Sequence, residues 1–166
     1  MSMLTFVNRA SFPGIKIIAP AAGRPVQLFF NPDLPRPCTV STNAPFEGPG
    51  KQAFEVRFAN KGSHNAVGFI ADSSLDFYLT PTYITKSGAA YVSMGGAGII
   101  YPEKVSQGSS YGVGDTVRCT IDFDERVVEF AVNGHSGVRA KWVHGAIAFP
   151  AISSAGGDVE CEVTFN

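Results

Sequence analysis

The sequence has few charged residues and almost no net charge. Asp, Glu, Lys and Arg make up 16% of the 166 residues, and the formal net charge at pH 7 is −1. A nucleic-acid-binding protein needs an excess of positive charge to neutralise phosphates, so the composition excludes this class. Intrinsic disorder requires low hydrophobicity and high net charge, whereas 45% of these residues are apolar. The composition therefore predicts a folded domain that does not bind nucleic acid.

Cysteine is scarce and lacks any metal-binding spacing. The three cysteines, Cys38, Cys119 and Cys161, are an odd number without a C-x-x-C pair, and the three histidines do not cluster with them. A disulfide framework or a zinc site needs paired or closely spaced ligands. We therefore expect no metal and no cofactor. We expect Cys119 and Cys161 to be buried as small apolar residues in a reducing compartment.

Long apolar segments are absent as well. No stretch has the length of a membrane-spanning helix or the apolar run of a secretory signal peptide, so no membrane partner is expected. These absences favour a cytoplasmic or nuclear protein. The first 32 residues carry Arg9, Lys16 and Arg24 without an acidic residue, a charge balance typical of a mitochondrial presequence. Pro13 and Pro20 argue against the amphipathic helix that such a presequence needs.

Glycine, proline and phenylalanine are abundant, with 18, 11 and 13 residues, and favour short strands joined by tight turns. The clearest pattern runs from residue 111 to 134. Apolar residues alternate there in two runs: Val117, Cys119, Ile121 and Phe123, then Val128, Phe130 and Val132. This period-two alternation predicts two strands that each bury one face. The charged segment between the runs and the Asn133-Gly134 pair predict tight turns.

Further strands are predicted at 25–30, 38–42, 53–58, 66–71, 76–80, 89–94, 145–153 and 159–165. The segment 66–71 is almost continuously apolar, which is typical of a strand that is buried on both faces. Many short antiparallel strands predict an all-β fold, a two-sheet antiparallel β-sandwich of the concanavalin-like jelly-roll kind. We expect this domain to span residues 24–166. Residues 1–23 are expected to form an N-terminal extension or an edge strand that contains Ile15 and Ile17.

The acidic residues of the same hairpin suggest one enzymatic alternative. The string TIDFDE, residues 120–125, resembles the E-x-D-x-x-E strand of jelly-roll glycosidases, in which two carboxylates carry the reaction. Thr120 stands where the first glutamate is required, so one essential carboxylate is missing. We therefore interpret Asp122 as an outward-facing residue and Asp124 and Glu125 as turn residues. We predict no catalytic residue and no enzyme activity.

A set of motifs in the second part of the chain resembles a known family. The segments are GDTVRCTID (114–122), FAVNG (130–134), FPAIS (149–153) and VECEVTFN (159–166), preceded by AFEVRF (53–58) and VGF (67–69). In this order they resemble the SPRY (B30.2-type) domain over roughly residues 50–166. The resemblance implies a β-sandwich that acts as a protein–protein interaction module or scaffold. It also implies that variable loops at one end of the sandwich carry the binding surface.

The resemblance and the composition each point to partner-binding residues. By position in the family pattern, the binding loops correspond to Tyr83 and to Ser154, Ala155, Gly156 and Gly157. Because Tyr, Trp and Arg dominate interface hot spots, the composition adds Tyr78, Tyr83, Tyr101, Arg139 and Trp142. Each residue of this second set could equally anchor a loop against the sandwich. We therefore expect a protein or peptide partner, with the chain as an isolated domain or a subunit of a larger complex. A lectin-like glycan-binding jelly roll is the alternative, and a jelly-roll glycosidase is less favoured.

Overall fold

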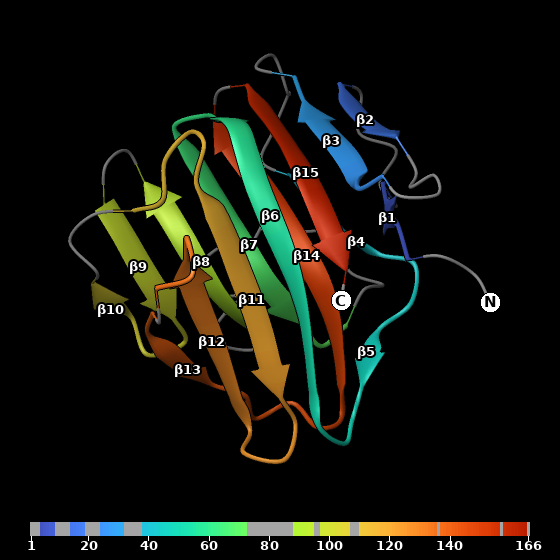
Figure 1. Ribbon diagram of the computed structural model, residues 1–166, viewed down its shortest axis with the longest axis vertical. Coiled ribbons are helices and arrows are strands. Elements are labelled where there is room, and N and C mark those ends of the chain that lie inside the picture. Colours follow the sequence, from blue (N-terminus) through green and yellow to red (C-terminus); the bar gives the residue numbers. More distant parts are fainter. Residues whose placement is uncertain are drawn as a thin grey trace.

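The computed structural model in Figure 1 describes residues 4–8, 14–18, 24–31, 38–72, 88–94, 97–106, 110–135, 137–156 and 158–165. Within these ranges the secondary structure is all strand and turn. The strands are β1 (Phe6–Val7), β2 (Ile15–Ile18), β3 (Val26–Phe30), β4 (Cys38–Thr42), β5 (Phe46–Glu47), β6 (Lys51–Lys61), β7 (His64–Ile70), β8 (Gly88–Met94), β9 (Ala97–Tyr101), β10 (Val105–Ser106), β11 (Thr116–Asp122), β12 (Val127–Val132), β13 (Arg139–Lys141), β14 (Ile147–Gly156) and β15 (Val159–Phe165). The described part of the chain contains no helix that could span a membrane.

The strands form two antiparallel sheets that pack face to face (Figure 1). The first sheet has the order β1-β4-β14-β7-β8-β9-β10, with β5 paired to β14, and the second has the order β13-β12-β11-β6-β15-β3-β2. The predicted all-β sandwich is confirmed. The two strands described within residues 1–23, β1 and β2, each lie at the edge of a sheet. The domain boundary at residue 24 stays a prediction, and the strand predicted at 76–80 lies outside the described residues.

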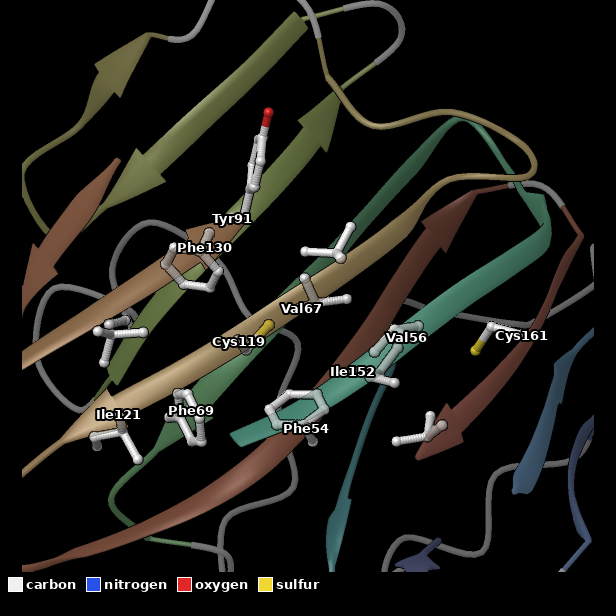
Figure 2. Close-up of a cluster of buried hydrophobic side chains, with 14 of the residues drawn as sticks. Phe54, Val56, Val67, Phe69, Tyr91, Cys119, Ile121, Phe130, Ile152 and Cys161 are labelled. Atoms are coloured by element: carbon white, nitrogen blue, oxygen red, sulfur yellow. The ribbon is translucent and has the colours of Figure 1, made fainter. Parts of the chain in front are cut away.

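The β11–β12 hairpin has the buried face that its alternation predicts. Val117, Cys119 and Ile121 of β11 are fully buried, and Cys119 lies opposite Phe130 of β12 in the antiparallel register. On the other side of β11, Cys119 is paired with Phe54 of β6. Figure 2 shows Phe54, Cys119, Ile121 and Phe130 of the second sheet in one cluster with side chains of the first sheet, such as Val67 and Phe69. Period-two geometry thus supplies one continuous core from both sheets.

The core is built around aromatic contacts between the sheets. The ring of Phe54 on β6 lies edge-on against that of Phe69 on β7, with centroids 5.3 Å apart and an interplanar angle of 84°. Edge-to-face contacts of this kind add to the free energy of burying the rings. Cys119 and Cys161 are buried in the same core, and burial raises the pKa of both thiols well above its usual value. Both cysteines therefore act as small apolar residues, as predicted.

The strand β7 is buried on both faces, which confirms the prediction for the apolar segment 66–71. Val67 and Phe69 point into the core between the sheets, whereas Ala66 and Ile70 belong to a second buried cluster on the opposite face of the first sheet. Gly68 permits close packing beside β8, because a Cβ atom there would lie 2.1 Å from the carbonyl oxygen of Ala89.

Candidate functional site

Connections between strands form both ends of the sandwich, and we name each end by one residue. The Asn133 end comprises the connections 62–63 and 110–115, the described residues 133–135 and 137–138 between β12 and β13, and the last residues of β14. The Trp142 end comprises the connections 48–50, 123–126 and 142–146. In Figure 1 the Asn133 end is uppermost, and the β11–β12 turn of the Trp142 end is at the bottom.

Of the residues predicted from the family resemblance, Ser154, Ala155 and Gly156 lie at the Asn133 end. Ser154 is fully buried near the end of β14, and its hydroxyl has no hydrogen-bond partner among the residues that the structure describes. Ala155 and Gly156 continue β14. Tyr83 and Gly157 lie outside the described residues. The loop expected after FPAIS is therefore mostly strand, because β14 extends through residue 156 to pair with β7.

The residues predicted from composition do not gather with them. Trp142 lies at the opposite end and is only 1% exposed, while Tyr101 is 3% exposed in the cluster on the outer face of the first sheet. Arg139 is exposed on the edge strand β13, where its Nε donates a hydrogen bond to a carboxylate oxygen of Glu129 at 3.2 Å. Tyr78 lies outside the described residues. The predicted partner-binding residues thus do not form one surface within the described part of the chain.

The Asn133 end is held together by its own turn residues. The Asp115 carboxylate accepts hydrogen bonds from the Gly112 backbone N–H at 2.6 Å and from the Asn133 side-chain amide at 2.9 Å. The Asn133 side-chain oxygen accepts from the Thr116 N–H at 2.9 Å. These bonds join the start of β11 to the end of β12. The Gly-Asp and Asn-Gly motifs that carry the family resemblance therefore have a structural role at this end.

The core beneath the Asn133 end is polar and aromatic. The Tyr111 hydroxyl donates to the side-chain oxygen of buried Asn65, whose amide nitrogen donates to the Lys61 carbonyl. The Lys61 ammonium donates to the Ser93 hydroxyl at 3.0 Å. Burial, followed by the charge of Asp115, raises the pKa of nearby Tyr91. This network of hydrogen bonds makes the Asn133 end rigid.

A groove of about 750 Å³ opens at the Trp142 end. Its lining comes from the β11–β12 turn and the β13–β14 loop and consists of Phe123, Glu125, Arg126, Val127, Lys141, Trp142, Val143, Gly145 and Ala146. Two other hollows on the described surface are smaller, at about 60 Å³ on the outer face of β3, β6 and β15 and about 470 Å³ beside β2 and β3. The groove has the size of a small-ligand or short-peptide site.

Backbone hydrogen bonds hold the walls of this groove in place. The Trp142 backbone N–H donates to the Arg126 carbonyl at 2.9 Å, and its indole Nε1–H donates to the Gly145 carbonyl at 2.9 Å. The Gly48 N–H donates to the Ala146 carbonyl at 2.9 Å, which ties the third connection to the other two. Trp142 packs edge-on against Phe69 of the core, with centroids 6.4 Å apart. The groove is therefore present before any partner arrives.

Apolar residues are exposed beside the buried tryptophan. Val143 is 70% exposed and Ile147, which begins β14, is 46% exposed. The sequence analysis did not identify Val143 as a candidate binding residue. Its position in a short loop, directly after the only tryptophan of the sequence, was the signal that could have indicated it. It also missed Arg126, whose left-handed backbone conformation, with φ of 58°, belongs to the tight turn after β11.

The carboxylates next to the groove are engaged in turn formation. One oxygen of Asp122 accepts from the backbone N–H groups of Asp124 and Glu125, both at 3.0 Å, and Asp124 accepts from the Gly50 N–H at 3.2 Å. The Lys51 ammonium lies 4.0 Å from Asp122. Asp124 and Glu125 lie in the β11–β12 turn, as predicted, whereas Asp122 is the last residue of β11 and faces away from the core but is half-buried rather than fully solvated. Within the described ranges, no group of three or more His, Cys, Asp or Glu side chains could hold a metal ion.

The fold is similar to that of a solved SPRY domain. The crystal structure of the SPRY domain of human HERC1 matches with a TM-score of 0.63 over 92% of this chain and 93% of that chain, at 16% sequence identity. No protein-family model matches the sequence, and no curated protein does. The chain has a SPRY-like fold, as the motifs predicted.

Proposed function

We propose that this SPRY-like domain is a non-catalytic protein-interaction module that binds a partner protein or short peptide at the Trp142 end. The observation that carries the proposal is the preformed groove, with Trp142 at its base and exposed Val143 on its wall. The likeness to the SPRY domain of human HERC1 concerns the fold and is compatible with this function. The sandwich would act as a scaffold that holds three connections in a binding arrangement.

The energetics favour a partner at this groove. Its walls are tied together by backbone hydrogen bonds, so little conformational entropy is lost when a partner binds. An exposed valine beside a buried tryptophan supplies apolar surface that a partner can remove from water, worth about 25 cal/mol per Å². The Asn133 end lacks this combination in its described part: its turn side chains bond to one another and to backbone groups, and exposed Val113 has no tryptophan beside it.

The chemistry of the described residues supports a binding role. Asp122 and Asp124 are engaged by backbone N–H groups, and burial keeps Cys119 and Cys161 protonated at neutral pH. The lectin-like alternative requires an exposed aromatic platform for sugar stacking, and Trp142 is buried. Free buried cysteines are compatible with a reducing compartment, so we place the chain in the cytoplasm or nucleus as part of a larger assembly.

A matched pair of surface variants tests the proposal. Val143 at the Trp142 end and Val113 at the Asn133 end are 70% and 66% exposed, so Val143→Asp and Val113→Asp place the same charge at opposite ends without a change in the core. Each tagged variant and the wild type are used for affinity purification from the native cell, followed by quantitative mass spectrometry. We expect Val143→Asp to reduce recovery of the reproducible partners at least about tenfold, as for a hot-spot residue.

Val113→Asp is expected to retain those partners. Loss with Val113→Asp and retention with Val143→Asp would move the site to the Asn133 end. Failure of the wild type to recover any reproducible partner would count against an interaction module altogether.

A further inference from the structure

Two cationic side chains on the groove wall have no ion-pair partner in the described part of the chain. Arg126 and Lys141 both line the groove and are exposed, and neither takes part in the three ion pairs formed by described residues, Lys51–Asp122, Arg118–Glu55 and Arg139–Glu129. Three other cations of the second sheet, Lys51, Arg118 and Arg139, are thus each paired with a carboxylate on a neighbouring strand. At the groove, two positive charges remain available to a partner.

The strand register places the two segments that carry these cations next to each other. Lys141 of β13 lies opposite Val127 of β12. Arg126 precedes Val127 and therefore lies opposite Trp142, the residue that follows Lys141. The hydrogen bond from the Trp142 N–H to the Arg126 carbonyl keeps this arrangement. One cation therefore stands on each of the two neighbouring segments that border the apolar base.

The acidic residues near the groove offset only part of the positive charge of Arg126 and Lys141. Asp122 and Asp124 accept backbone hydrogen bonds in the β11–β12 turn, and Glu103 accepts from the Lys141 backbone N–H at 2.8 Å. These bonds compensate part of their negative charge locally. Among the described residues, the groove lining contains one acidic residue, Glu125, and two cationic residues, Arg126 and Lys141. The balance of the lining favours an anionic occupant.

Resting on the proposed function, we propose that the groove binds a short linear peptide segment in which an acidic residue adjoins an apolar one. The apolar side chain packs against Phe123, Val127 and Val143 above Trp142. The carboxylate lies between Arg126 and Lys141. The apolar contact supplies most of the affinity, and the cations select the sequence and raise the association rate.

A peptide selection identifies the ligand chemistry without a known partner. A phage-displayed library of random 12-residue peptides is selected against the folded wild-type domain, with the Val143→Asp variant as the counter-selection. We expect enriched peptides to carry Asp or Glu next to a large apolar residue. The selected peptides are then synthesised with a fluorescent label, and their Kd values are measured by anisotropy at low and high NaCl.

Charge variants give the sign of the effect. Arg126→Gln and Lys141→Gln are each expected to weaken binding about two- to fivefold, Glu125→Gln to strengthen it by up to about threefold, and added salt to weaken it. Arg139→Gln is the control, because Arg139 lies on the same strand as Lys141 but is paired with Glu129 outside the groove. This control is expected to leave Kd unchanged within about 1.5-fold.

The outcomes separate this inference from the proposed function. Peptides that lose binding in Val143→Asp but show no acidic enrichment, or bind equally well to Lys141→Gln, would overturn the acidic preference and leave the groove as the site. A parallel selection is run without the counter-selection, and peptides from it that bind Val143→Asp normally but are lost with Val113→Asp would overturn both proposals at the Trp142 end. A selection that enriches nothing over Val143→Asp would overturn the linear-peptide ligand, while a folded partner surface could still use the groove.

Discussion

At the Asn133 end the turn side chains bond to one another as well as to backbone groups, whereas at the Trp142 end, in the described part of the chain, the turn aspartates accept hydrogen bonds only from backbone N–H groups and an apolar groove opens beside them. Asp115 and Asn133 form a closed set of hydrogen bonds that joins two strands. Asp122 and Asp124 instead stabilise the turn that borders the groove. The same residue types therefore close one end and shape an accessible surface at the other.

The difference explains why the motifs of the sequence and the candidate site lie apart. The Gly-Asp and Asn-Gly motifs are recognisable because a left-handed turn and its side-chain bonds tolerate few residue types; Asn133 and Gly134 have φ of 52° and 79°. The groove requires only apolar and cationic side chains at its rim. Such positions tolerate many residues, so they carry little signal in a single sequence.

The largest expected effect compares a glycine at each end. A Cβ atom on Gly137 would lie 1.6 Å from the Phe130 carbonyl oxygen, a backbone atom that cannot move aside cheaply. Gly145 at the Trp142 end has open space around it and a φ of 87°, so alanine there meets only backbone strain. We expect Gly137→Ala to lower the free energy of unfolding by about 3 kcal/mol and Gly145→Ala by about 1 kcal/mol.

Thermal unfolding by circular dichroism measures both effects. At this chain length the two values correspond to decreases in Tm of about 6–12 °C and 2–4 °C, respectively. Equal decreases in Tm for the two variants would show that the backbone around Gly137 accommodates a Cβ atom as easily as the loop around Gly145 does. This result would contradict the predicted difference between the two ends.

A smaller effect compares the two capping aspartates. Asp115 accepts hydrogen bonds at 2.6 and 2.9 Å, whereas Asp124 accepts one from the Gly50 N–H at 3.2 Å. We expect Asp115→Ala to cost about 1–2 kcal/mol and Asp124→Ala about 0.5 kcal/mol of unfolding free energy, because more and shorter bonds are lost at the Asn133 end. Urea titration followed by tryptophan fluorescence reports both values. A greater loss of unfolding free energy for Asp124→Ala than for Asp115→Ala would show that the Trp142 end, and not the Asn133 end, is the more tightly bonded.

The smallest expected effect is a pH dependence at each end. Burial lowers the pKa of His64 at the Asn133 end and of His144 at the Trp142 end below the usual 6.5. The unfolded chain therefore binds these protons at a higher pH than the folded chain does. Stability is unaffected above about pH 6.5 and is lost as pH falls from there towards the folded pKa values.

Proton NMR titration of the imidazole signals checks the two pKa values directly. His64→Gln and His144→Gln should each reduce the loss of Tm between pH 7 and pH 5, by an amount below that of the aspartate variants because both rings are partly exposed. A measured pKa above 6.5 for either ring would contradict the burial that the packing implies.

The hairpin illustrates how far the sequence alone could lead. The buried positions of β11 and β12 follow from alternation, since successive side chains of a strand point to opposite faces whatever surrounds it. The same reasoning gave the doubly buried strand β7 and the outward position of Asp122. It failed to gather the partner-binding residues, because the exposure of Trp142, Tyr101 and Ser154 depends on which other strands cover them.

Sequence by itself determined most of the longer strands, their buried faces and the tight turns, because each of these depends on neighbours a few residues apart, and the order of its motifs gave the resemblance to a SPRY-like sandwich. It did not indicate β9 or β13, which are completed by pairing with β8 and β12. Tertiary structure decided that the connections 48–50, 123–126 and 142–146 meet at one end and that Trp142 lies beneath Val143 there. That meeting depends on strand order and register across two sheets. Arg126 and Lys141 become neighbours at a groove only once β12 and β13 are paired.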